Sequence, residues 1–217
     1  MDRMMDEHAA RLSMAAAGAR LGARGLIVAL EGNFSIRLGS TILVSPAGRR
    51  KDELEPDDMV LVPLERPGDG PDAPDAFGRR PSSDVATHRA IYLARPDVMA
   101  IVHAHLASSL ALTTAGLAPD PADLPETQLF LPRLPVLPLL PMGSPSLAAA
   151  VAAAMSDRGT SGEEPLPGAV LLERHGPIAV GPDIQTAGNR IELVDLLCRV
   201  RMDVVMLHAA VRSGTDR

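Results

Sequence analysis

Two histidines separated by a single residue are the first candidates for chemistry in this 217-residue chain. His103 and His105 end the run 97–106, in which apolar and partly β-branched residues predict a buried strand. Side chains two positions apart on a strand project from the same face, so both imidazoles are expected to share one small volume. The pair is typical either of metal ligands or of ordinary hydrogen-bonded histidines, and a third ligand is needed to choose between them.

His175 is the candidate for that third ligand. It follows another predicted buried strand, 168–173, in a turn that Gly176 relaxes. Three neutral imidazoles at strand ends, with one coordination position left for a substrate, form the ligand set of an open catalytic zinc site.

The other three histidines have weaker settings. His8 and His208 lie on predicted terminal helices without partners, and we interpret both as structural or exposed. His88 follows Asp84 by one helical turn, so the two share a helix face. We therefore predict that His88 supports the site through a hydrogen bond and is not a ligand.

Three short segments carry groups that bind a phosphate without a strongly basic pocket. Gly32-Asn33 precedes a predicted strand, where the backbone can approach a ligand closely. The turn 45–48 follows a strand, and its amides are expected to point outward. Ser82-Ser83 begins a predicted helix, with either serine as the N-cap and Asp84 in the first turn. Ser and Asp at a helix start are usually only capping residues, which is the alternative explanation of the last segment.

A basic cluster, Arg49-Arg50-Lys51, lies beside the turn 45–48. It is typical either of a substrate clamp or of a solvated surface.

Helices and strands alternate along the chain and indicate an α/β fold that places these residues. The segment 66–80, rich in Pro, Gly and Asp, reads as a surface loop, and the last residues as disordered. The final helix carries one apolar stripe, formed by Ile191, Val194, Leu197, Val200 and Val204. The patterns predict helices over 4–24, 81–95, 107–115, 144–155 and from 183 or 186 to 211, a hairpin of 31–38 and 41–45, further strands at 58–63, 97–106, 168–173 and 178–180, and an extended segment at 134–141.

Composition and charge limit the classes of function. The formal net charge is −6, which gives a nucleic-acid partner no electrostatic support. Cys198 is the single cysteine and sits in an apolar run, so we expect a packed, unreactive thiol in a reducing cytoplasm. Neither a signal-peptide core nor a run long enough for a membrane span is apparent. The length suits a single domain over 1–217.

Five motifs, in this order, resemble those of the class II aldolase/adducin superfamily, which includes sugar-phosphate aldolases and 4-epimerases. The resemblance extends from about Gly32 to the final helix. The motifs are Gly32-Asn-Phe-Ser35, Ser45-Pro-Ala-Gly48, Pro81-Ser-Ser-Asp84, His103-Ala-His105 and Arg174-His-Gly176.

The resemblance implies a three-layer α/β/α fold around a mainly antiparallel sheet, and a homotetramer with active sites between subunits. It also implies that His103, His105 and His175 bind a divalent metal, usually zinc. The residues implied to line a phosphate pocket are Gly32, Asn33, Ala47, Gly48, Ser82 and Ser83.

The chain departs from the family pattern in its acid–base residues. The aldolases carry Glu where this chain has Asp84, and the shorter side chain favours either metal ligation or a base of shorter reach. Asp84, Thr87-His88 and Pro177 are more similar to the 4-epimerases. Where those enzymes have a further Asp, this chain has Gln128, with Glu126 two residues earlier.

Tyrosine is the second departure. Both enzyme groups use tyrosines that this chain lacks, because Tyr92 is its only one and follows Asp84 on the same helix. An acid from a neighbouring subunit would fill the gap, and Glu126 is the first candidate.

The sequence therefore predicts a metal-dependent lyase of the aldolase type, acting on a small phosphorylated or carboxylated sugar-like substrate through an enediolate. The alternatives are a pentulose-phosphate 4-epimerase and a decarboxylase or dehydratase of the same superfamily. A non-catalytic module like that of adducin is the third reading, although the resemblance implies that such a module lacks the histidines present here.

Overall fold

A mixed sheet of seven strands forms the centre of the computed structural model, which describes residues 6–65 and 72–215. The strand order is β3-β2-β1-β4-β7-β6-β5, and the described neighbours pair antiparallel except for the parallel pair β5 and β6. The strands are β1 (Asn33–Leu38), β2 (Thr41–Val44), β3 (Val60–Pro63), β4 (Ala100–His103), β5 (Val136–Leu137), β6 (Ala169–Leu172) and β7 (Gly176–Gly181).

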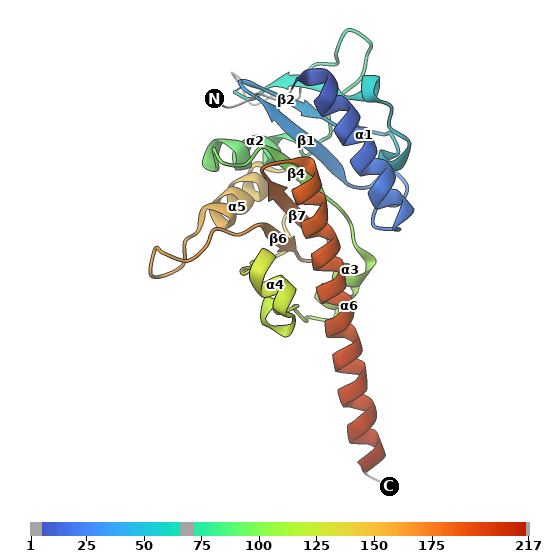
Figure 1. Cartoon of the computed structure of the whole chain (residues 1–217), viewed down its shortest axis with the longest axis vertical. Coiled ribbons are helices and arrows are strands. Elements are labelled where there is room, and N and C mark those ends of the chain that lie inside the picture. Colours follow the sequence, from blue (N-terminus) through green and yellow to red (C-terminus); the bar gives the residue numbers. More distant parts are fainter. Residues whose placement is uncertain (1–5, 66–71, 216–217) are drawn as a thin grey trace.

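Helices cover both faces of this sheet (Figure 1). One face packs against α1 (Glu7–Ala23), α3 (Ala107–Thr114) and α6 (Ile184–Thr215). The other packs against α2 (Val85–Ala94) and α5 (Pro145–Ser156). The three-layer α/β/α arrangement around a mainly antiparallel sheet is therefore confirmed. Short helices complete the described chain: α4 (Pro125–Phe130), which contacts α6, and 3₁₀ turns at Lys51–Glu53, Pro56–Asp58 and Pro121–Asp123.

The alternation of side chains along β4 decides which layer receives the histidines. Ala100 and Val102 belong to the core under α1 and α6, whereas Ile101 belongs to the core under α2 and α5. Since neighbouring residues on a strand face opposite ways, His103 lies on the same face as Ile101, toward the layer of α2 and α5.

Most predicted elements are present, and the differences lie at their ends. The hairpin of β1 and β2 turns at Gly39-Ser40 as predicted, and Ser144 caps α5 by accepting a hydrogen bond from the Leu147 amide at 3.1 Å. Helix α4 was not predicted. Residues 66–71 of the predicted loop lie outside the described residues, as do 4 and 5 of the first helix.

Helix α6 continues to Thr215, past the predicted end at 211. Figure 1 shows its C-terminal half extending well beyond the sheet. The predicted stripe is therefore buried at Ile191, Val194 and Leu197 but only half-buried at Val200 and Val204, where the helix leaves the core.

The lone thiol behaves as the sequence predicts. Cys198 is fully buried in the core under α6, and burial raises its pKa to about 12. Of the helices described here, none combines the length and the apolar character that crossing a bilayer requires.

Gly176 is a position where the fold excludes any side chain. Its φ is +114°, and an added Cβ would collide with the carbonyl oxygen of Ala104. We predict that Gly176→Ala lowers the free energy of unfolding by about 3 kcal/mol, from backbone strain and overpacking together. Urea denaturation would measure this loss. Gly25→Ala is the matched control, because its φ is +68° with open space around it, and about 1 kcal/mol is expected. Equal losses in the two variants would contradict the steric argument.

Candidate metal centre

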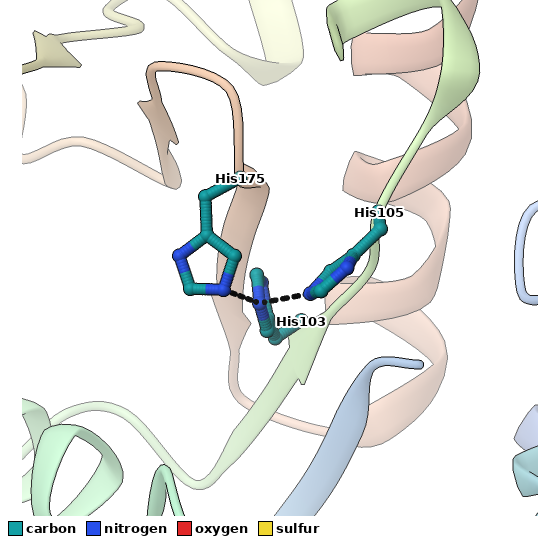
Figure 2. A group of neighbouring side chains, drawn as sticks. All are labelled: His103, His105 and His175. Atoms are coloured by element: carbon teal, nitrogen blue, oxygen red, sulfur yellow. Dashed lines mark hydrogen bonds between the residues drawn. The ribbon is translucent and has the colours of Figure 1, made fainter. Parts of the chain in front are cut away.

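The three histidines that the sequence predicts as metal ligands converge on one point (Figure 2). The Nε2 atom of His103 lies 3.0 Å from Nε2 of His105 and 3.3 Å from Nε2 of His175. Tetrahedral zinc with Zn–N bonds of about 2.0–2.1 Å places its ligand nitrogens about 3.3 Å apart. The spacing and the ligand type therefore fit a divalent metal such as zinc.

The position of His103 is fixed by the two strands that flank β4. It is the last residue of β4, where it pairs with Asn33 of β1 and Ile178 of β7. Its Nδ1 lies 2.9 Å from the carbonyl oxygen of Pro177, which can only accept. The ring proton of neutral His103 therefore sits on Nδ1, and Nε2 keeps its lone pair for a metal.

His175 is presented by the tight turn between β6 and β7. Arg174 adopts a left-handed φ of 54°, and its amide donates to Thr113 Oγ1 of α3 at 3.0 Å. The His175 amide donates to the Leu172 carbonyl at 3.2 Å. These two hydrogen bonds tie the turn to α3 and to the end of β6, and so hold His175 at the end of the β6–β7 pair.

His105 lies two residues beyond β4 and is the most exposed of the three, with 19% of its side chain accessible. Its Nδ1 lies 3.8 Å from Oε1 of Glu31. Glu31 belongs to none of the motifs recognised in the sequence. Its position immediately before Gly32-Asn33 is the signal that could have pointed to it.

Burial sets the protonation of the cluster. It is the main cause that lowers the pKa of each of the three imidazoles, and that of His103 falls well below its usual value. Repulsion from neighbouring imidazoles adds to this lowering of the pKa for His103 and His175, whereas the Glu31 and Asp84 carboxylates oppose it for His105. Neutral imidazole is the form that ligates metals, so the environment favours the ligating state at neutral pH.

Asp84 stands at the start of α2 as its N-cap, not in the first turn as predicted, and its side chain makes no capping bond. Instead, Oδ2 accepts a hydrogen bond of 2.8 Å from Asn33 Nδ2. The other oxygen, Oδ1, is buried and has no hydrogen-bond partner among the described residues. A carboxylate at a helix start whose free oxygen is not used for capping is available for chemistry.

The hydrogen bond of the His88 side chain is made with Ser35, whose hydroxyl also meets Tyr92. The Nδ1 atom of His88 lies 2.7 Å from Ser35 Oγ, which is also 2.8 Å from the hydroxyl of Tyr92. Asp84 interacts with His88 electrostatically, and the His88 amide donates to the Asp84 carbonyl at 3.2 Å, but among the described residues no hydrogen bond joins the two side chains. Tyr92, the only tyrosine, is fully buried, and burial raises its pKa above the usual range, so it is not an acid for a substrate.

The segments predicted to bind phosphate lie together beside the histidines. The turn 45–48 is bridged to the chain before α2 by a pairing of Pro46 with Pro81. Asn33 joins this region through Asp84 and pairs with His103 across the sheet. The fold therefore brings the following small residues into one region at the edge of the candidate metal centre: Gly32, Asn33, Ala47, Gly48, Ser82 and Ser83.

The amides of this region are less free than predicted. The Ser45 amide donates to the Phe34 carbonyl at 3.0 Å and the Ala47 amide to the Arg80 carbonyl at 2.9 Å. Pro46 has no amide to offer. An anion would therefore meet Gly48 and the side chains of the region instead of the whole turn.

The neighbouring basic cluster is occupied by its own chain. Lys51 is buried, and its Nζ donates to the Leu30 and Arg49 carbonyls. Arg49 pairs with Asp58, and Arg50 with Asp52. Lys51 is therefore neither a substrate clamp nor a solvated surface residue, because its ammonium binds backbone carbonyls of its own chain.

Glu126 is not brought to the histidines within this chain. It is exposed on α4 and lines a groove of about 1060 Å³ between α4 and α6. None of the residues lining this groove is a histidine, so its size does not make it the site of chemistry. Gln128 is likewise exposed on α4.

As predicted, His8 and His208 are exposed.

Known proteins are similar to this chain in sequence and in fold. The chain matches the family described as Class II Aldolase and Adducin N-terminal domain over residues 12–202. It is 30% identical over 204 residues to a 3-oxo-tetronate 4-phosphate decarboxylase from Cupriavidus necator, covering 92% of this chain and 86% of the relative. It is 28% identical over 204 residues to a methylthioribulose-1-phosphate dehydratase from Granulibacter bethesdensis, covering 89% and 91%.

A solved structure shows the same arrangement. The L-fuculose-1-phosphate aldolase from Thermus thermophilus superimposes with a TM-score of 0.76 at 29% identity, covering 93% of this chain and 97% of that one. These relatives carry three different reaction names on one fold.

Because His88 is buried, we predict that the fold loses stability in acid. Burial lowers its pKa from 6.5 to about 4 despite the nearby Asp84 carboxylate. Between these values the unfolded chain binds a proton that the native protein does not, so stability falls as the pH drops from about 6.5 to 4. His88 contributes up to about 3 kcal/mol of this loss. Urea denaturation across that pH range should therefore give a flatter profile for His88→Gln, while His8→Gln, at an exposed histidine, should follow the unsubstituted protein. A His88→Gln profile as steep as the unsubstituted one would contradict this assignment.

Proposed function

This chain is an enzyme of the class II aldolase and adducin family, and on that premise we propose that it is a metal-dependent lyase acting on a small phosphorylated or carboxylated sugar-like substrate. The observation that carries the proposal is the convergence of three neutral Nε2 atoms within hydrogen-bonding distance. The same observation argues against a non-catalytic adducin-like module, because buried imidazoles facing one another serve no packing purpose that apolar residues would not serve better.

His103, His105 and His175 hold the proposed divalent metal, for which zinc is our candidate because of the three-nitrogen ligand set. When bound, the metal supplies the Lewis acid that stabilises the enediolate charge left by cleavage next to a carbonyl.

The chain's own groups bind and orient the substrate. Asn33, Gly48, Ser82 and Ser83 offer an amide, a hydroxyl or a backbone N–H to a phosphate. Gly32 and Ala47 shape this pocket without an exposed polar side chain, and the Ala47 amide is already used. The substrate phosphate would thus be held beside the histidines by uncharged polar groups.

Asp84 is the proposed proton carrier. Asn33 fixes one of its oxygens, and the buried free Oδ1 is the atom that would take or return a proton at the substrate. Metal ligation by the same oxygen is the alternative that the sequence left open, and the two roles differ in their effect on metal binding.

Decarboxylation is a second candidate, favoured by a specific observation. Aldol cleavage must remove a hydroxyl proton and then protonate a carbon, whereas a 3-oxo acid loses CO₂ without any prior deprotonation and only its enediolate carbon needs a proton. Tyr92 is buried and its hydroxyl bonds to Ser35, so the acid–base group that we assign is Asp84, whose Oδ1 is buried and without a hydrogen-bond partner among the described residues. One acid–base group suffices for decarboxylation. The 30% identity to a named 3-oxo-tetronate 4-phosphate decarboxylase supports this reading.

We also propose a homotetramer with active sites between subunits, working in the cytoplasm. The groove between α4 and α6 exposes Leu129, Phe130 and Leu196, which a second copy would cover. In such an assembly, Glu126 of a neighbouring copy could complete a site.

The first test is metal content. Purified protein is expected to contain one divalent metal per chain by elemental analysis, and His103→Ala is expected to contain almost none, because it removes the central ligand. His8→Ala is the control, since His8 is exposed on α1. Protein without stoichiometric metal, or a His103→Ala variant that binds like the original, would refute the proposed metal centre.

Asp84→Asn separates the two roles of the carboxylate. If Asp84 carries a proton, the variant keeps its metal while kcat falls by about 10²- to 10⁴-fold. Elemental analysis and steady-state kinetics measure the two quantities on one sample. A variant that loses the metal together with activity would instead make Asp84 a ligand.

The reaction is distinguished by incubating the loaded protein with three candidate substrates. We expect CO₂ and dihydroxyacetone phosphate from 3-oxo-tetronate 4-phosphate if decarboxylation is the reaction, or an aldehyde from L-fuculose 1-phosphate if it is aldol cleavage. Formation of D-xylulose 5-phosphate from L-ribulose 5-phosphate would instead establish the epimerase alternative and refute the lyase.

A further inference from the structure

Glu31 lies where the loop before β1 meets the end of β4. The loop is shaped by two residues with left-handed backbone, Ala29 at φ 53° and Gly32 at φ +71°. The Glu31 amide donates to the Val28 carbonyl at 3.2 Å. A Cβ on Gly32 would come within 2.6 Å of the His103 carbonyl oxygen. The loop is therefore held tightly against the backbone that carries the histidine pair.

This placement brings the Glu31 carboxylate to the outer nitrogen of His105. The Nε2 atom of His105 faces His103, while its Nδ1 lies 3.8 Å from Glu31 Oε1. To ligate through Nε2, a neutral imidazole must carry its proton on Nδ1. That proton needs an acceptor, and a half-exposed glutamate side chain needs to move by only about 1 Å to reach hydrogen-bonding distance.

The three ligands differ in how they are held. His103 is buried in a strand and has the Pro177 carbonyl as its acceptor. His105 follows the strand in irregular structure and is more exposed. It is the ligand that gains most from a second contact to fix its ring and its tautomer.

We propose that Glu31 is a positioning residue for the metal centre: its carboxylate accepts the Nδ1 proton of His105, orients the ring and increases the basicity of Nε2. A carboxylate behind a metal-ligating histidine has this effect in general. The inference rests on the proposed metal-dependent function and assigns a role to a residue that the sequence motifs did not include. Glu31 is not itself a ligand in this assignment, because it meets the nitrogen that does not face the other imidazoles.

The test measures the affinity for Zn²⁺ alone, by competition with a chromophoric chelator, so that no substrate is needed. Glu31→Ala is expected to weaken binding about 10- to 100-fold. Glu31→Gln keeps an acceptor oxygen and should recover part of the loss. Glu53→Ala is the matched control, because it also removes one exposed carboxylate, on the 3₁₀ turn Lys51–Glu53. Glu31 is half-exposed, so neither variant is expected to disturb the fold.

The possible results separate the role of Glu31 from the proposed metal-dependent function. Failure of the unsubstituted protein to bind Zn²⁺ would overturn both. Tight binding by the unsubstituted protein with less than about a threefold loss in Glu31→Ala would overturn only the role of Glu31. If Glu53→Ala weakened Zn²⁺ binding as much as Glu31→Ala, the effect would come from the overall charge of the protein, and the role of Glu31 would be overturned. Equal losses of affinity in Glu31→Ala and Glu31→Gln would overturn the hydrogen-bonding role.

Discussion

The hydrogen bond from His103 Nδ1 to the Pro177 carbonyl is the interaction on which the rest of the centre depends. It joins adjacent strands at the point where β4 ends, and it decides which nitrogen of the central ligand is free. Without it, a buried imidazole could adopt either tautomer, and one of the two would point a proton at the metal position. The backbone pairing of His103 with Asn33 and Ile178 keeps the acceptor in register. Strand register thus sets the chemistry, because a slip by one residue would turn His103 to the opposite face.

Three buried polar atoms close to the candidate centre have no hydrogen-bond partner among the described residues. These atoms are Asn33 Oδ1, Asp84 Oδ1 and His88 Nε2. Leaving such groups unpaired costs about 1–3 kcal/mol each, so the fold is less stable than a fully satisfied one. The cost is understandable if a polar substrate or ordered water satisfies these atoms, since groups fixed before binding need no reorganisation during the reaction.

Local patterns predicted the parts of the site that lie within one segment. A strand over 97–106 predicted His103 and His105 on one side; the two rings do meet, although β4 ends at His103 and His105 follows it in irregular structure. A strand followed by a glycine turn predicted His175 at a strand end, where it lies. The role of Asp84 was harder to predict, because its bond to Asn33 joins residues 51 positions apart. Asp84 proved to be the N-cap, and the Ala47 amide proved to be engaged, because the partner of each depends on tertiary contacts. Glu31 and the Ser35–Tyr92 contact escaped prediction for the same reason: no short-range periodicity encodes which side chain crosses to a neighbouring segment.

The arrangement around Asp84 also limits which reactions one fold can support. A shared metal ligand set supplies charge stabilisation to every enediolate, so the reaction is selected by the groups that move protons. Here the only tyrosine is used inside the protein, where its hydroxyl meets Ser35 and burial keeps it protonated. Asp84 is held at one oxygen by Asn33, and its other oxygen is buried without a hydrogen-bond partner among the described residues. A site with one such group favours a reaction in which the leaving group departs without first surrendering a proton, and loss of CO₂ from a 3-oxo acid meets that requirement.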